Sequence, residues 1–145
     1  MDRCYRNPTG LYCGVKDTVM GKNSNDPPSV LIAEDDLIYQ RLLEKYIEQA
    51  GGRCEFASDG KDAFEKATEN EYDLIFIDIH IPSLDGVMLV KLLREEGCTT
   101  PLIAVTALQL ECLERNALTV GFNEFFQKPI TKAEILSLFE KYCRS

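Results

Sequence analysis

From residue 29 onward, strand-sized apolar runs alternate with longer segments that have helical spacing. The predicted strands cover residues 30–33, 53–57, 74–77, 102–105 and 125–127. Most of these runs are apolar at successive positions, which is typical of strands that are buried on both faces. The segments between them place apolar residues three and four positions apart, which predicts helices. The pattern therefore predicts five successive β-α units.

Turn and cap residues mark the ends of the predicted helices, which span about residues 37–50, 59–70, 87–96, 108–120 and 131–142. Three helices end at glycines, which favour the backbone conformation found after a helix: Gly51, Gly97 and Gly121. Side chains that can cap an N-terminus precede three helices: Asp36, Ser58 or Asp59, and Thr131. In the first helix the inward face is predicted to contain Leu42, Leu43, Tyr46 and Ile47.

Five β-α units of this length require a parallel sheet with helices on both faces, because right-handed crossovers place the helices there. The predicted fold class is therefore α/β, with a doubly wound five-stranded parallel sheet. A chain of 145 residues buries roughly two thirds of its unfolded surface, which is enough for one core.

The chain divides near residue 28. Residues 1–28 show no sustained hydrophobic period, and residues 21–28, Gly-Lys-Asn-Ser-Asn-Asp-Pro-Pro, are typical of turns and linkers. We therefore expect residues 1–28 to form a flexible tail or linker and residues 29–145 to form the folded domain.

Composition argues against several classes of protein. The net charge of −8 disfavours direct binding to nucleic acid, which requires clustered lysine and arginine. The apolar runs are too short for a membrane span, and the N-terminus lacks the apolar region of a signal peptide, so we expect a cytoplasmic or nuclear location and no membrane contact.

The six cysteines form no Cys-x-x-Cys pair and His80 is the only histidine, which disfavours a zinc site. Cys54 and Cys112 are interpreted as apolar fillers.

Residues with potential chemistry follow four of the predicted strands. Asp78 ends a buried run and precedes a turn that contains Pro82 and Gly86. The other strand ends carry three acids, a hydroxyl and a lysine: Glu34, Asp35 and Asp36, then Thr106, then Lys128. Because the carboxyl ends of parallel strands meet at one edge of the sheet, these side chains are expected to converge there.

Such a group of residues suits phosphoryl transfer to an aspartate. Carboxylates about 5 Å apart repel each other by roughly 3 kcal/mol per pair at an effective dielectric constant near 20, so a divalent cation is expected to neutralise them. A site of oxygen ligands suits Mg²⁺. A carboxylate can then act as the nucleophile, while the metal, an ammonium and a hydroxyl stabilise the transferring group. The residues that would supply these groups are Asp78, Asp35, Lys128 and Thr106.

These four motifs, in this order, resemble the receiver domain of two-component response regulators over about residues 29–145. The resemblance implies a flavodoxin-like (βα)5 fold with strand order 2-1-3-4-5, which is the order known for a bacterial receiver. It implies that Asp78 is the phosphoacceptor, that Lys128 pairs with it, and that Thr106 is the switch hydroxyl. Phe125 matches the aromatic switch position, and the Lys128–Pro129 bond falls where the family often has a cis peptide.

The resemblance also implies a Mg²⁺ site. Its ligands would be Glu34, Asp35, Asp78 and the backbone carbonyl of His80, with Asp35 the direct ligand and Glu34 acting through water. Asp36 is expected to cap the first helix. Leu37 and Ile81 depart from common family residues without removing a phosphorylation residue, and the apolar Leu108 disfavours fast self-dephosphorylation.

By this resemblance the chain is a signalling domain that catalyses its own phosphorylation and dephosphorylation. Its partner would be a histidine kinase or a histidine phosphotransfer domain, and phosphorylation would switch the face formed by the fourth helix, the fifth strand and the fifth helix. It could stand alone or belong to a hybrid histidine kinase, on the cytoplasmic side of the membrane.

Two alternative functions stay open. One is an interaction module that is not phosphorylated, and the other is an Asp-nucleophile phosphatase of the haloacid dehalogenase type. Such phosphatases need a second aspartate at the position of His80.

Overall fold

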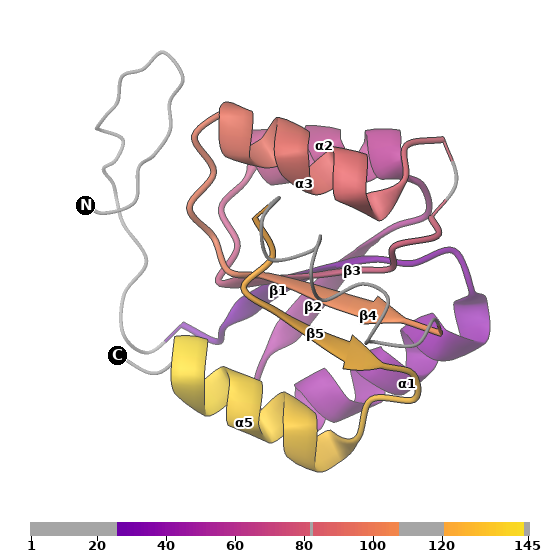
Figure 1. Ribbon diagram of the computed structural model, residues 1–145. Helices are drawn as coiled ribbons and strands as arrows, with labels where there is room; N and C mark the ends of the chain where they lie inside the picture. The colour runs from indigo at the N-terminus through magenta and orange to yellow at the C-terminus, as the bar shows by residue number, and fades with distance from the viewer. Residues whose placement is uncertain (1–25, 82, 108–120, 144–145) are drawn as a thin grey trace.

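The computed structural model describes residues 26–81, 83–107 and 121–143. Within these ranges, five strands form one parallel sheet in the order β2-β1-β3-β4-β5 (Figure 1). The strands are β1 (Ser29–Ala33), β2 (Arg53–Ala57), β3 (Leu74–Ile77), β4 (Leu102–Thr106) and β5 (Glu124–Gln127). The described helices are α1 (Leu37–Gln49), α2 (Gly60–Glu69), α3 (Gly86–Glu95) and α5 (Lys132–Tyr142). The predicted fold class and strand order are confirmed.

Helices cover both faces of the sheet. Figure 1 shows α2 and α3 on one side and α1 and α5 on the other. Successive side chains of a strand point to opposite faces, so Leu74 and Phe76 of β3 pack on the α1/α5 side while Ile75 and Ile77 pack on the α2/α3 side. All four residues of β3 are buried, which explains why this strand is apolar at every position.

The predicted strand boundaries agree with the structure to within one residue. Residues 53–57 and 74–77 are strands as predicted, and the other three strands are each one residue longer. The additions are Ser29 at the start of β1, Thr106 at the end of β4 and Glu124 at the start of β5.

The helix caps follow from local sequence. Asp36 accepts hydrogen bonds from the backbone N–H groups of Ile38 and Tyr39 at the start of α1, and Asp59 rather than Ser58 caps α2. Thr131 caps α5, where Glu134 completes a reciprocal capping box.

None of the described helices is long and apolar enough to span a lipid bilayer. The predicted helix over 108–120 and the predicted tail up to residue 25 lie outside the described residues.

The strand register delivers the predicted site residues to one edge. Ala33 pairs with Ile77, so Glu34 and Asp78 leave neighbouring strands at the same level, and the Asp78 N–H donates to the carbonyl of Ala33 at 3.0 Å. On the other side of β3, Thr106 ends β4, and the Lys128 N–H donates to its carbonyl at 2.7 Å. The carboxyl ends of four strands therefore lie at the same edge of the sheet.

Candidate functional site

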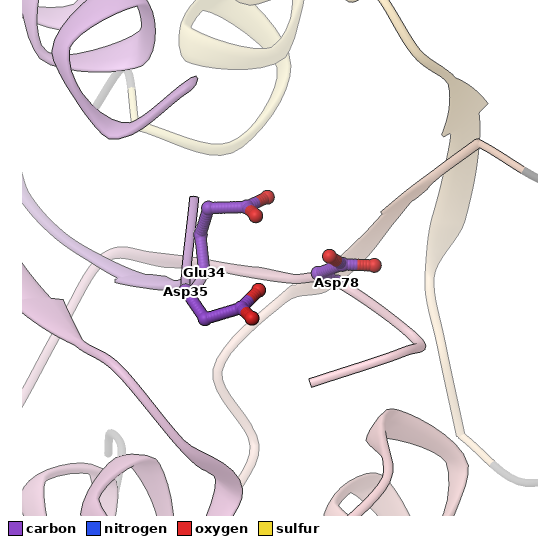
Figure 2. A group of neighbouring side chains, drawn as sticks. All are labelled: Glu34, Asp35 and Asp78. Carbon is purple, nitrogen blue, oxygen red and sulfur yellow. The ribbon is translucent and has the colours of Figure 1, made fainter. Parts of the chain in front are cut away.

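Three carboxylates meet at the carboxyl edge of β1 and β3. Glu34, Asp35 and Asp78 each offer an oxygen, and these oxygens lie within 4.8 Å of one another. Figure 2 shows the carboxylates of Glu34 and Asp35 extending toward Asp78. Glu34 is 2% exposed and Asp78 is 8% exposed, whereas Asp35 faces solvent. The site therefore combines two buried carboxylates with one that is open to water.

Lys128 reaches this group from the end of β5. Its Nζ lies 2.8 Å from Oε1 of Glu34 and 3.3 Å from Oδ2 of Asp78. The resemblance predicts that Lys128 pairs with Asp78, and the structure adds a shorter ion pair with Glu34. The Lys128–Pro129 peptide bond is cis, as expected.

Burial and the ion pairs shift the pKa values of Glu34 and Lys128. Burial raises the pKa of Glu34 and the nearby Asp78 carboxylate adds to this, while the hydrogen bond from Lys128 opposes it without reversing it. Burial alone would lower the pKa of Lys128, but its contacts with Glu34 and Asp78 outweigh burial and raise that pKa. Lys128 is therefore held in its charged form.

The carboxylates fit a divalent cation. When all three carboxylates are ionised, the group together with the Lys128 ammonium has a net charge of −2, which one divalent cation would neutralise. Carboxylate oxygens are hard ligands, which suit Mg²⁺ better than softer metals. The exposure of Asp35 leaves one side open to the water ligands that Mg²⁺ retains.

Backbone N–H groups of neighbouring residues donate hydrogen bonds to Asp78 and Glu34. The His80 N–H donates to Oδ1 of Asp78 at 3.1 Å, while His80 itself is exposed. The Asp36 N–H donates to Oε2 of Glu34 at 3.1 Å, and the side chain of Asp36 caps α1 as expected. In the loop after β3, the backbone of Gly86 lies close to that of Ile79. A Cβ on residue 86 would be only 2.7 Å from Cα of Ile79, so this close approach requires glycine.

The two predicted switch residues share a face of the sheet. Thr106 is fully buried at the end of β4. Phe125 pairs with Ala104 and packs, half-buried, on the α2/α3 side. Residues two apart in a strand point to the same face, so Thr106 and Ala104 both face the side on which Phe125 packs.

Two residues of α1 contact the site and were missed by the sequence analysis. The ring centroid of Tyr39 lies 4.4 Å from Nζ of Lys128, and the side-chain amide of Gln40 donates to the backbone carbonyl of Glu34. Both residues are buried. Tyr39 lies four positions before Leu43. Extending the predicted inward face by one helical turn would therefore have included Tyr39, close to the acids at the start of the helix.

Comparison with known proteins assigns the family. The chain belongs to the response regulator receiver domain family, whose match covers residues 30–140. It is 33% identical to the sensor histidine kinase RcsC of Salmonella typhimurium over 75% of this chain and 12% of that protein. It is 37% identical to the two-component response regulator ARR22 of Arabidopsis thaliana over 76% of this chain and 80% of that protein. The chain is thus a receiver module of two-component signalling, and it spans 12% of the length of the kinase.

Solved structures show the same fold. The receiver domain of the Francisella response regulator 1452 superposes with a TM-score of 0.74 at 32% identity, over 79% of this chain and 94% of that one. The receiver domain of the sensor histidine kinase PA1611 from Pseudomonas aeruginosa superposes with a TM-score of 0.73 at 30% identity. That match covers 80% of this chain and 97% of the other, in which a magnesium ion is coordinated in the active-site cleft.

Proposed function

We propose that this receiver accepts a phosphoryl group on Asp78 from a phosphohistidine, in a reaction that requires Mg²⁺. The observation that carries the proposal is the meeting of Asp78 with Glu34, Asp35 and Lys128 at one sheet edge. Asp78 follows the fully buried central strand, and its two oxygens already have separate partners in His80 and Lys128.

In the proposed reaction, a carboxylate oxygen of Asp78 attacks phosphorus and the phosphorus–nitrogen bond of the phosphohistidine breaks. The electron pair of that bond returns to the imidazole nitrogen, which takes up a proton. The Lys128 ammonium and the Thr106 hydroxyl would bind phosphoryl oxygens, so that charge developing on them is met by groups already in place.

Glu34, Asp35, Asp78 and the carbonyl of His80 would hold Mg²⁺, which supplies neutralising charge for the carboxylates and for the transferring group. The oxygen donor set and the charge excess of the carboxylates support this assignment. The magnesium ion in the related Pseudomonas receiver supports it further.

The phosphoryl donor would be a histidine kinase or a histidine phosphotransfer domain. The match to sensor histidine kinases supports a kinase-linked donor. We further propose that phosphorylation draws the Thr106 hydroxyl inward and lets Phe125 follow, so that β5 and α5 carry the response together with the segment over 108–120, which lies outside the described residues.

The test is the variant Asp78→Asn. Asparagine is nearly isosteric but its amide is a poor nucleophile, so the variant should fold and accept no phosphoryl group. In the wild-type protein, intact mass should increase by one phosphoryl group with a phosphohistidine donor or acetyl phosphate. The adduct should require Mg²⁺ and should be removed by hydroxylamine.

Asp85→Asn is the matched control, because Asp85 lies in the same loop and caps α3, where asparagine serves equally well. This control should still form the adduct. An adduct that persists in Asp78→Asn, or that resists hydroxylamine, would mean that the acceptor is a different residue. The absence of any adduct in the wild-type protein would favour an interaction module that is not phosphorylated.

A further inference from the structure

Tyr39 lies in the first turn of α1 and is not among the groups of the proposed reaction. Its ring centroid is 4.4 Å from Nζ of Lys128, inside the limit of about 6 Å for a cation–π interaction. Tyr39 is 9% exposed. The ring is thus an additional partner of the ammonium that contacts Glu34 and Asp78.

The hydroxyl group of Tyr39 makes a second contact with the same loop. It accepts a hydrogen bond from the Ile130 N–H at 2.9 Å, across 91 positions of sequence. Ile130 is 1% exposed and lies two residues after Lys128. Burial raises the pKa of Tyr39 above its usual value, so the hydroxyl stays neutral. The Tyr39 side chain therefore contacts both the backbone that follows Lys128 and the Lys128 ammonium.

The ring differs from the other partners of the ammonium in one respect. Glu34 and Asp78 are also the proposed metal ligands, so a bound cation would weaken their attraction for Lys128. A phenol ring is not a metal ligand in this proposal, and its attraction for the ammonium does not depend on a free carboxylate. The long lysine side chain has several rotatable bonds, and without the ring it could turn away once the carboxylates are engaged.

We propose that Tyr39 is a positioning residue for phosphoryl transfer, whose ring keeps the Lys128 ammonium beside Asp78 while the carboxylates bind a cation. The inference rests on the proposed function, because it assigns Tyr39 to that reaction. It predicts separate effects for the two parts of the side chain. The ring should govern the reaction rate, and the hydroxyl should govern the stability of the loop at Ile130.

The experiment measures the rate of Asp78 phosphorylation by acetyl phosphate at saturating Mg²⁺ in three variants. Tyr39→Leu removes the ring and should slow phosphorylation about threefold to tenfold, the range expected for losing one cation–π contact. Tyr39→Phe keeps the ring and should stay within about twofold of the wild-type rate, while its thermal midpoint falls because the Ile130 N–H loses its acceptor.

Tyr46→Leu is the matched control. Tyr46 lies on the same helix and packs, partly buried, against the same apolar cluster, but two turns, about 10 Å, further along the axis. Its substitution should lower stability without changing the phosphorylation rate. A purely structural role for Tyr39 would instead make Tyr39→Leu and Tyr46→Leu behave alike at equal loss of stability.

A second measurement reports the contact without any reaction. The Cε protons of Lys128 should be shielded by the ring current of residue 39 in the wild-type protein and in Tyr39→Phe, with and without Mg²⁺. That shielding should disappear in Tyr39→Leu and persist in Tyr46→Leu. Unchanged Lys128 proton shifts in Tyr39→Leu, or loss of the shielding when Mg²⁺ binds the wild-type protein, would overturn the inference.

Failure of the inference and failure of the proposed function have different signatures. If the wild-type protein forms no adduct, or if Asp78→Asn still forms one, the proposed function is wrong whatever Tyr39 does. If the wild-type adduct forms on Asp78 and Tyr39→Leu forms it at the wild-type rate, the function stands and Tyr39 has no positioning role.

Discussion

Glu34 and Asp35 are adjacent acids with different surroundings. Glu34 is buried and its two oxygens contact Lys128 and the Asp36 N–H. Asp35 is exposed, although one of its oxygens lies within 4.8 Å of the other two carboxylates. Asp35 is therefore the acid best placed to meet a cation arriving from solvent, while Glu34 is already engaged by the lysine.

The variant Asp35→Asn should weaken Mg²⁺ binding at least about tenfold and slow phosphorylation in step with the loss of bound metal. The metal-free protein should keep its fold. Its free energy of unfolding should rise by up to about 1 kcal/mol, because Asp35 is exposed and water screens its repulsion with the other carboxylates to about that size. Mg²⁺ titration and urea unfolding of the metal-free protein measure the two effects. In the control Asp36→Asn, asparagine preserves the cap of α1, so both quantities should stay at wild-type values. Equal Mg²⁺ affinity in Asp35→Asn and the wild-type protein would remove Asp35 from the metal site.

At the scale of elements, β4 lies between β3, which precedes Asp78, and β5. Thr106 is fully buried and shares a sheet face with Phe125. A phosphoryl group beside Thr106 would offer oxygens for its hydroxyl, and a small movement of Thr106 would change the space beside Phe125.

The variant Thr106→Ala should therefore still accept the phosphoryl group but show a smaller response in β5 and α5. The measurement is the amide chemical-shift change of residues 124–142 on phosphorylation, compared between variant and wild-type protein. Thr100→Ala is the control, because Thr100 lies before the opposite end of β4, where its hydroxyl donates to the Tyr72 carbonyl. A wild-type response confined to α2 would contradict this route of switching.

A second link between elements joins the start of β5 to the last turn of α5. The Glu124 carboxylate accepts hydrogen bonds from Lys141 Nζ at 2.7 Å and from the Tyr142 hydroxyl at 2.6 Å. Burial alone would raise the pKa of Glu124, but these two contacts outweigh burial and lower that pKa.

This shift makes a prediction about pH. An acid whose pKa is lower in the folded state stabilises the fold above its unfolded pKa, and that stabilisation is lost as the pH falls through the folded value. The wild-type protein should therefore have a higher thermal midpoint than Glu124→Gln at pH 7, and the difference should shrink below about pH 4.5, the ordinary pKa of the group. Glu69→Gln, at an exposed position of α2, is the control and should have the thermal midpoint of the wild-type protein at pH 7. A gap that stays constant from neutral to acidic pH would contradict the assigned cause.

At the scale of the whole molecule, the predicted site residues and the hydrogen bonds of Arg94 lie at opposite edges of the sheet. The carboxyl edge carries the acids and Lys128. The amino ends of β4 and β5 are joined to α3 by Arg94, whose guanidinium donates to three backbone carbonyls and one side chain: those of Cys98, Thr100 and Gly121, and Oδ1 of Asn123. Gly121 has φ +126°, and a Cβ there would lie 2.8 Å from Cγ of Arg94, so the close approach requires glycine.

The variant Arg94→Met should lower the free energy of unfolding by about 2–3 kcal/mol, because partly buried acceptors lose their donor. Below the unfolding transition it should phosphorylate at the wild-type rate, since Arg94 lies at the other edge of the sheet. Lys91→Met, at an exposed position of the same helix, should change neither quantity appreciably. A slower phosphorylation rate in folded Arg94→Met would show that the two edges are coupled.

The sequence by itself determined the strands to within one residue, the caps Asp36 and Thr131, and the identity of the acids. A strand such as residues 74–77 is buried on both faces and is therefore apolar at every position. Caps such as Asp36 and Thr131 act on backbone groups within one turn. These are local effects, so short windows of sequence contain them. The strand order came from the resemblance, because periodicity alone does not say which parallel strands are neighbours.

Only the tertiary structure decided which side chains contact one another at the site. The Lys128 ammonium lies closer to Glu34 than to Asp78. The ring of Tyr39 covers the ammonium although 89 positions of sequence separate the two residues. Likewise, nothing local predicts that Arg94 would donate to carbonyls up to 27 positions away. The physical reason is that such contacts depend on which elements pack together and on side-chain rotamers, which are set by the whole core rather than by neighbouring residues.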